Sequence, residues 1–218
     1  MSDAAALGTA GAPLRRVVVG ISGASGIVYG MRLLQRLGEL DGVETHSVIS
    51  PSARRTADYE LDLGPTELES LADVHHRYQD LAASISSGSF KTDGMVVAPC
   101  SIKTLSSIAN CFSDNLLSRA ADVTLKERKP LVLLVRETPL HVGHLRLMLQ
   151  AAEMGAVLMP PLPAFYNRPT SLDEMVDYSV TRALDQLGLD LPDTRRWEGS
   201  RPPAGRDRSR ASASPVPD

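Results

Sequence analysis

The stretch Val17-Val18-Val19-Gly20-Ile21-Ser22-Gly23-Ala24-Ser25-Gly26 decides the fold of this chain. A strand predicted over 15–20 enters a glycine turn, and the turn opens a helix predicted over 27–40. Glycines let backbone N–H groups approach a ligand closely, and the N-terminus of the helix carries a partial positive charge. The glycine spacing fits neither G-x-G-x-x-G nor the P-loop. The stretch therefore predicts either a cradle for an anionic cofactor or a tight turn without a ligand.

Length and charge narrow the class of protein. A chain of 218 residues is long enough for one domain with a sizeable core. Its net charge of −3 gives no reason to expect a nucleic-acid or membrane partner. The spacing of Cys100 and Cys111 suits neither a zinc site nor a disulfide framework. Without an apolar stretch of transmembrane length or a signal-peptide pattern, we expect a cytoplasmic protein.

Apolar runs alternate with helical patterns along the rest of the chain. Further strands are predicted at 43–49, 74–78, 94–98, 130–135 and 156–159. Capping residues predict helix starts after Ser50-Pro51, Thr66, Pro99, Ser113-Asp114, Thr138-Pro139 and Ser171. Alternation of this kind is typical of βαβ units. We predict a three-layer, doubly wound parallel α/β sheet of flavodoxin-like (Rossmann-like) type, in one domain over 15–198 between disordered segments 1–14 and 199–218.

The carboxyl ends of parallel strands share one edge of the sheet, where open α/β folds bind ligands. The polar residues expected at that edge are Ser22, Ser25, Ser50, Ser101, Thr104, Arg136 and Glu137. Any one hydroxyl is more simply explained as a helix cap. Several hydroxyls with an arginine together indicate a site for a phosphate-bearing cofactor.

Other charged and histidine residues have plainer interpretations. Arg119 and Lys126 share a helix face, where an Asp122–Lys126 pair on a solvated surface would explain them. Arg182 lies off the apolar stripe of the last predicted helix, which favours solvent exposure. The histidine pairs 75–76 and 141–144 have no carboxylate or cysteine at ligand spacing, so no metal site is predicted.

Six motifs follow one another in order: 20–26 (GISGASG), 86–90 (SSGSF), 99–105 (PCSIKTL), 119–128 (RAADVTLKER), 136–140 (RETPL) and 163–166 (PAFY). This set closely resembles the UbiX-type flavin prenyltransferases, over residues 16–197. The resemblance implies a metal-independent enzyme that joins the dimethylallyl group of dimethylallyl monophosphate to N5 and C6 of reduced FMN. Its product, prenylated FMN, would serve a UbiD-type decarboxylase in ubiquinone-type or aromatic-acid decarboxylation. The family also implies a homododecamer with sites shared between subunits.

The resemblance further implies roles for single residues. FMN would be held by Gly23, Ala24, Ser25, Ser50, Ser101, Ile102, Lys103, Thr104 and Arg136. The dimethylallyl phosphate would be held by Tyr166, Arg182, Lys126 and Arg119. Ser25, Glu60, Glu137 and Lys126 would be catalytic, with Glu137 as the acid/base.

Three alternatives share this fold or its flavin. Flavin-dependent cysteine decarboxylases use an asparagine-bearing loop where this chain has Ser101 to Thr104, which argues against them. A direct aromatic-acid decarboxylase and an FMN-binding accessory subunit of a decarboxylase remain open. Only a prenyltransferase would add a five-carbon unit to the flavin.

Overall fold

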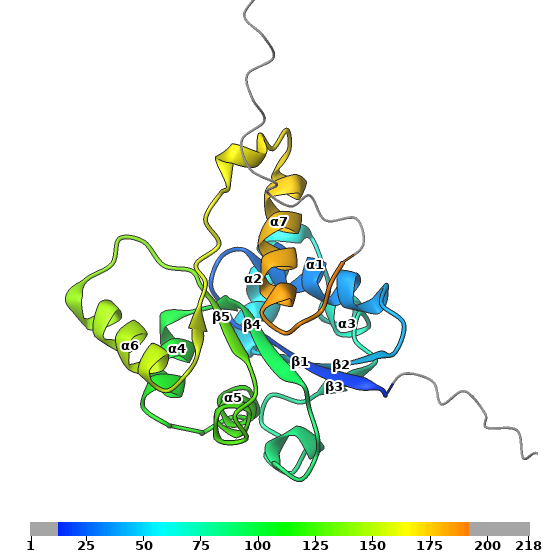
Figure 1. The fold of residues 1–218 in the computed structure, drawn as a ribbon, viewed down its shortest axis with the longest axis vertical. Helices are drawn as coiled ribbons and strands as arrows, with labels where there is room; N and C mark the ends of the chain where they lie inside the picture. The colour runs from blue at the N-terminus through cyan, green and yellow to red at the C-terminus, as the bar shows by residue number, and fades with distance from the viewer. Residues whose placement is uncertain (1–12, 192–218) are drawn as a thin grey trace, which may run out of the picture.

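The structure is a computed structural model that describes residues 13–191. A six-stranded, all-parallel sheet with the order β3-β2-β1-β4-β5-β6 forms its centre (Figure 1). The strands are β1 (Arg15–Ile21), β2 (Val43–Ile49), β3 (Val74–His76), β4 (Gly94–Cys100), β5 (Leu131–Val135) and β6 (Val157–Leu158). Because the chain order reverses between β1 and β4, the predicted doubly wound sheet and its shared carboxyl edge are confirmed.

Helices cover both faces of this sheet. They are α1 (Ile27–Gly38), α2 (Pro51–Leu61), α3 (Pro65–Glu69), α4 (Ile102–Ala109), α5 (Leu116–Lys126), α6 (Val142–Glu153) and α7 (Leu172–Asp185). The 3₁₀ turns η1 (Ser84–Ser86) and η2 (Phe165–Asn167) lie in the connections. One core cluster contains side chains of the helices α1, α2, α3 and α7. The other contains side chains of α4, α5 and α6.

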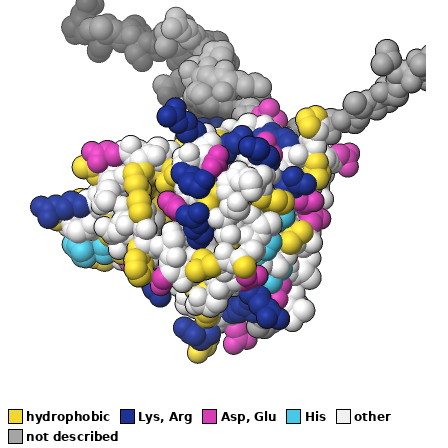
Figure 2. All heavy atoms as spheres, turned by 90° about the horizontal axis from the view of Figure 1, so that it is seen from below, with side chains coloured by type: hydrophobic (Ala, Val, Ile, Leu, Met, Phe, Trp, Pro, Cys, Tyr) yellow, Lys and Arg dark blue, Asp and Glu magenta, His cyan; other side chains and the backbone are white. Residues whose placement is uncertain are grey.

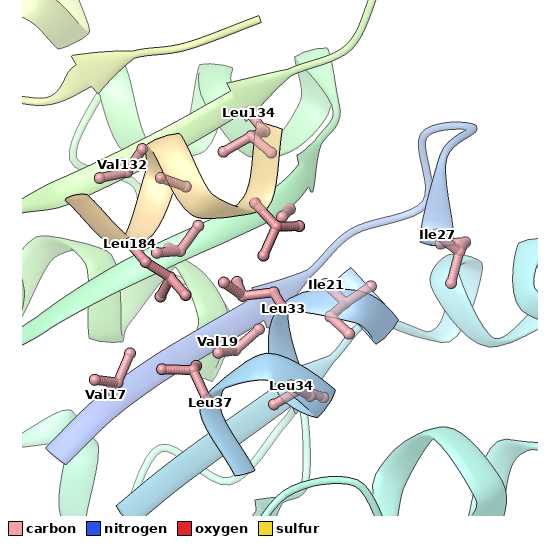
Figure 3. Close-up of a cluster of buried hydrophobic side chains, with 14 of the residues drawn as sticks. Val17, Val19, Ile21, Ile27, Leu33, Leu34, Leu37, Val132, Leu134 and Leu184 are labelled. Carbon is pink, nitrogen blue, oxygen red and sulfur yellow. The ribbon is translucent and has the colours of Figure 1, made fainter. Parts of the chain in front are cut away.

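Successive side chains of a strand point to opposite faces, and this divides the core in two. Val17, Val19 and Ile21 of β1 belong to the first cluster, together with leucines of α1 (Figure 3). Val18 belongs to the second cluster. In Figure 3, Leu184 of α7 lies near Val132 of β5, so α1 and α7 cover the same face. Valine-rich runs in the central strands are what a sheet buried on both faces requires.

Three predicted helix starts were wrong. The Asn115 side chain caps α5 by accepting from the Ser118 N–H at 3.0 Å, so Ser113-Asp114 remain in the loop. At α6 the cap is His141, whose Nδ1 accepts from the Gly143 N–H at 3.0 Å, and not Thr138-Pro139. At α3 the cap is Gly64, two residues before the predicted Thr66, and the Glu67 carboxylate accepts from the Gly64 N–H at 2.8 Å. In each case, the side chain that meets the first free amides sets the boundary.

Smaller differences concern the ends of elements and one loop. The third strand ends at His76 rather than at 78, and the first helix ends at Gly38 rather than at 40. The segment 84–89, expected as a polar loop, contains the turn η1 and buries Ile85 in the second core cluster. The predicted disordered tail, 199–218, and residues 1–12 of the predicted disordered N-terminus lie outside the described residues. Within residues 13–191, no helix has the length and apolar character needed to cross a bilayer.

Candidate functional site

A pocket of about 250 Å³ opens at the carboxyl edge of the sheet, between the N-termini of α2 and α4. Ser50 caps α2, and its Oγ accepts from the Ala53 N–H at 3.1 Å. Ser101 caps α4, and its Oγ accepts from the Thr104 N–H at 3.3 Å. The positive ends of two helix dipoles therefore converge on one space lined with hydroxyls. This arrangement suits a phosphate group.

The pocket also contains residues that the sequence analysis missed. Its lining consists of Ser50, Pro51, Ser52, Arg55, Tyr78, Gln79, Ser101, Lys103 and Thr104. Arg55 and Lys103 add two cations, and burial raises the pKa of the Tyr78 hydroxyl. The signal for Arg55 was available, since it lies four residues beyond the start of α2. Tyr78 and Gln79 follow β3 and reach the pocket only because β3 is the edge strand beside β2.

Of the predicted FMN contacts, Ser50, Ser101, Lys103 and Thr104 line this pocket, whereas Gly23, Ala24, Ser25, Ile102 and Arg136 do not. Ile102 lies between two lining residues. Its side chain is half-buried and packs against the second core cluster. It therefore anchors the first turn of α4, while its neighbours line the pocket.

The glycine turn is fastened to the edge of the sheet by Ser22. Its buried hydroxyl donates to the Pro99 carbonyl at 2.8 Å and accepts from the Ser101 N–H at 2.7 Å. A Cβ on Gly23 would lie 2.4 Å from the Ser52 side chain, so only glycine allows the turn to pack against α2. These contacts bring the turn, the start of α2 and the start of α4 together.

At the N-terminus of α1, a carboxylate already occupies the position where an anion was expected. Glu60 Oε2 accepts from the Gly26 N–H at 2.9 Å and from the Ile27 N–H at 3.0 Å. Burial raises the pKa of Glu60, but hydrogen bonds from Ser25, Ile27 and Gly26, with the charge of Arg136, outweigh it and lower the pKa overall. Glu60 is therefore an ionised cap on α1, and the free phosphate-binding space lies at α2 and α4 instead.

Arg136 and Glu137 follow β5 at the same edge. The Arg136 N–H donates to the Cys100 carbonyl at 3.0 Å, and its guanidinium forms no hydrogen bond or ion pair within residues 13–191. Burial raises the pKa of the Tyr29 hydroxyl, and the positive charge of Arg136 lowers it by a smaller amount. Glu137 is exposed and accepts from the Thr138 N–H at 2.9 Å rather than pairing with Arg136. Both side chains are thus available at the edge.

Arg119 and Lys126 form a second cluster. Within one chain, this cluster lies away from the pocket. Lys126 ends α5, and the chain then enters the start of β5, whereas Arg136 follows the end of that strand. Arg119 Nε donates to the Ser86 carbonyl at 3.1 Å, and Lys126 Nζ lies where a Cβ on Gly88 would be 2.6 Å away. The 86–90 motif and the two cations therefore gather as a unit, here called the α5 cluster.

Ion pairs in the α5 cluster differ from the expected one. Arg119 pairs with Asp122 at 2.6 Å, and Lys126 pairs with Glu127, so the Asp122–Lys126 interpretation was wrong. Figure 2, seen from below Figure 1, shows basic side chains interspersed with carboxylates. The cations are partly neutralised by neighbours that an incoming phosphate could replace.

Tyr166 and Arg182 gather at α7 with a residue that the sequence analysis missed. The Tyr166 and Tyr178 hydroxyls share a hydrogen bond, and their rings meet edge to face at 6.1 Å. Burial and this hydrogen bond raise the pKa of Tyr178, while the charge of Arg182 lowers it. Arg182 itself is exposed and pairs with Asp185. The position of Tyr178, four residues before Arg182 on one helix face, was the signal that could have identified it.

No three His, Cys, Asp or Glu side chains between residues 13 and 191 lie where they could hold a metal ion together. The buried Cys100 is not set up as a nucleophile. Burial raises the pKa of the Cys100 thiol to about 12, so it stays protonated at neutral pH.

Comparison with known proteins identifies the family. The family described as Flavoprotein matches residues 10–164. Flavin prenyltransferase UbiX of Escherichia coli K12 is 60% identical over 189 residues, which cover 86% of this chain and all of that protein.

Solved structures agree. AnUbiX (PadA1), in complex with FMN and dimethylallyl pyrophosphate, has a TM-score of 0.83 at 50% identity and covers 86% of this chain and 99% of its own. A dodecameric FMN-dependent UbiX-like decarboxylase from E. coli O157:H7 has a TM-score of 0.82 at 49% identity. The match covers 84% of this chain and 100% of that one. The family and these relatives agree that the cofactor is FMN, and the chain belongs to the UbiX-type flavin prenyltransferases.

Proposed function

We propose that this protein transfers the dimethylallyl group of dimethylallyl monophosphate to N5 and C6 of reduced FMN. The observation that carries the proposal is the pocket at α2 and α4, where two helix N-termini, Ser50, Ser101 and Lys103 converge. These donors fit the FMN phosphate without a metal ion. The flavin ring would then extend along the carboxyl edge toward Arg136 and the glycine turn.

The reaction breaks the bond between the allyl carbon and the phosphate oxygen. N5 of reduced FMN would take that carbon and give up its proton. The allyl double bond would then take up a proton, its tertiary carbon would bond to C6, and C6 would lose its proton. Glu137, exposed at the edge, would accept this proton. Arg182 and the α5 cluster would stabilise the departing phosphate, since charge-assisted hydrogen bonds to guanidinium and ammonium groups are strong. Tyr166 would close the site over the allyl group.

A single chain does not provide all of these groups in one place. Lys126 and Arg136 lie at opposite ends of β5, so the α5 cluster serves a pocket on another copy of the chain. We therefore propose a homododecamer with sites between subunits, and the E. coli O157:H7 relative is described as dodecameric. The protein would be cytoplasmic, and the predicted domain end at residue 198 lies outside the described residues.

The test is anaerobic incubation with reduced FMN and dimethylallyl monophosphate, followed by mass spectrometry of the released flavin. We expect the flavin to gain one five-carbon unit, and to do so in the presence of a metal chelator. Unmodified flavin after full incubation with either the monophosphate or the pyrophosphate ester would refute the proposal.

The name of the E. coli O157:H7 relative favours one second candidate, an FMN-dependent decarboxylase. Carbon dioxide released from an aromatic acid by this protein and FMN alone would support that candidate. On the first proposal, decarboxylation appears only when the prenylated flavin is passed to a UbiD-type enzyme.

A further inference from the structure

We propose that the outer face of α6 binds a second copy of this chain, and the proposal rests on the homo-oligomer proposed above. The outer face consists of Val142, Leu145 and Leu149. An α-helix turns ~100° per residue, so these three positions project to one side.

The inner side of α6 accounts for its attachment to the fold. Ala151 is fully buried, and Leu147 and Met148 pack against the second core cluster beside α4 (Figure 1). Leu147 and Ala151 lie on the side of the helix roughly opposite the outer face, and Met148 lies between the two sides. The outer face is therefore not needed to hold α6 in the monomer.

The outer face is exposed and apolar. Val142 is 61% exposed, Leu145 is 50% exposed and Leu149 is 60% exposed. A helix at the surface of a soluble domain normally has one apolar stripe and a polar side opposite. A helix with apolar residues on two opposite sides has the pattern of a helix packed between two layers, and the described chain supplies only one layer.

A second copy is the occupant that the observations favour. A membrane-surface helix would be rich in Lys and Arg, yet α6 contains one arginine, Arg146, and one glutamate, Glu153. A relative that is 49% identical, and that this chain matches over its whole length, is dodecameric. An exposed apolar patch on a soluble protein often marks a contact with another protein, and in an oligomer that contact joins two subunits. The loop before α6 also begins with Arg136 and Glu137, so a copy docked here would lie next to the pocket edge.

The test uses the full chain and light scattering after size exclusion. In Leu145→Glu/Leu149→Glu, two charges would be buried at the contact, so we expect the measured mass to fall below that of the wild-type oligomer. Tyr59→Glu is the matched control, because Tyr59 is 88% exposed on α2, away from α6, and we expect it to keep the wild-type mass. Circular dichroism checks that each variant is folded.

If Leu145→Glu/Leu149→Glu does not fold, the oligomer mass is measured on Leu145→Gln/Leu149→Gln instead, since glutamine is a good helix former of similar size. A folded variant of either kind with the wild-type mass would overturn the proposal, as would a wild type with the mass of one 23.4 kDa chain. Flavin mass spectrometry separates this result from the proposed function. An active wild type whose mass neither variant changes refutes the docking face alone, and an inactive oligomer that the variants dissociate refutes the proposed function alone.

Discussion

The pocket at the carboxyl edge and the α5 cluster contrast in how far one chain completes them. At the pocket, Ser50 and Ser101 cap α2 and α4, and the buried Ser22 ties the start of α4 to the end of β1, so the lining hydroxyls are in position before a ligand arrives. In the α5 cluster, Arg119 and Lys126 pair with carboxylates beside them. On the proposed function, this contrast would assign cofactor binding to one chain and departure of the substrate phosphate to contacts between copies.

The largest effect is expected from Glu137→Gln. Glutamine keeps the size and the hydrogen-bonding oxygen but cannot take up a proton, so turnover should fall ~10²–10⁴-fold, the usual contribution of an acid/base residue. FMN binding should persist, because the pocket does not include Glu137. Single-turnover flavin spectra measure the step, and Glu153→Gln, at the exposed end of α6, is the control. Turnover within about twofold of wild type would remove Glu137 from the mechanism.

Lys126→Ala should produce the next largest loss. Removing a cation that stabilises the departing phosphate should lower turnover by ~10²–10³-fold. FMN affinity should stay unchanged, since Lys126 lies at the other end of β5 from the pocket. Lys129→Ala, which removes the same charge three residues later, is the control. A loss of FMN affinity in Lys126→Ala, with turnover of bound flavin intact, would reverse the assignment of the two regions.

Ser101→Ala tests the pocket and should have a moderate effect. The change removes the cap of α4, worth about 1 kcal/mol of stability, and a hydroxyl that faces the phosphate. FMN affinity should fall about tenfold, equal to ~1.4 kcal/mol. Ser107→Ala is the control, because Ser107 is on the same helix outside the pocket and donates to the Lys103 carbonyl. Fluorescence titration measures the FMN affinity of both variants. If Ser101→Ala and Ser107→Ala bind FMN equally well, the FMN phosphate lies elsewhere.

The smallest effect is a pH dependence of stability at the β2–β3 edge of the sheet. Burial, followed by the charges of His46 and His75, lowers the pKa of His76 from 6.5, while Asp80 opposes this. His76 Nε2 meets His46 Nδ1 at 2.9 Å, and His46 in turn bonds Glu44.

His76 binds a proton more readily in the unfolded chain than in the folded one. The free energy of unfolding should therefore fall as pH drops below 6.5 and level off below the pKa of His76 in the folded chain. His76→Gln should flatten this part of the profile in urea titrations between pH 7.5 and 5. An unchanged slope would show that other groups cause the loss.

The fold could be predicted because its determinants are local. The glycine stretch and the valine-rich runs predict strands and turns through their periodicity, and the alternation of strands with helices predicts a parallel sheet. Helix starts such as Asn115 and His141 were missed because several nearby residues can cap, and only the folded backbone selects one of them.

The site could be predicted only in part. Ser50 and Ser101 carry cap signatures in the sequence, and the resemblance added Arg136 and the α5 residues. Glu60 is different, because it meets Gly26 and Ile27 across 34 residues of chain, a contact that no local pattern encodes. Groups that come together between copies cannot be located from one chain at all.

Subunit complementation tests the central claim most directly. Glu137→Gln and Lys126→Ala chains, each nearly inactive, would be co-expressed with different tags and the mixed oligomers purified through both. If each site takes Glu137 from one copy and Lys126 from another, random pairing restores about a quarter of the wild-type activity. If both residues act from the same copy, the mixture will be no more active than the average of the two variants, and that result would contradict the account.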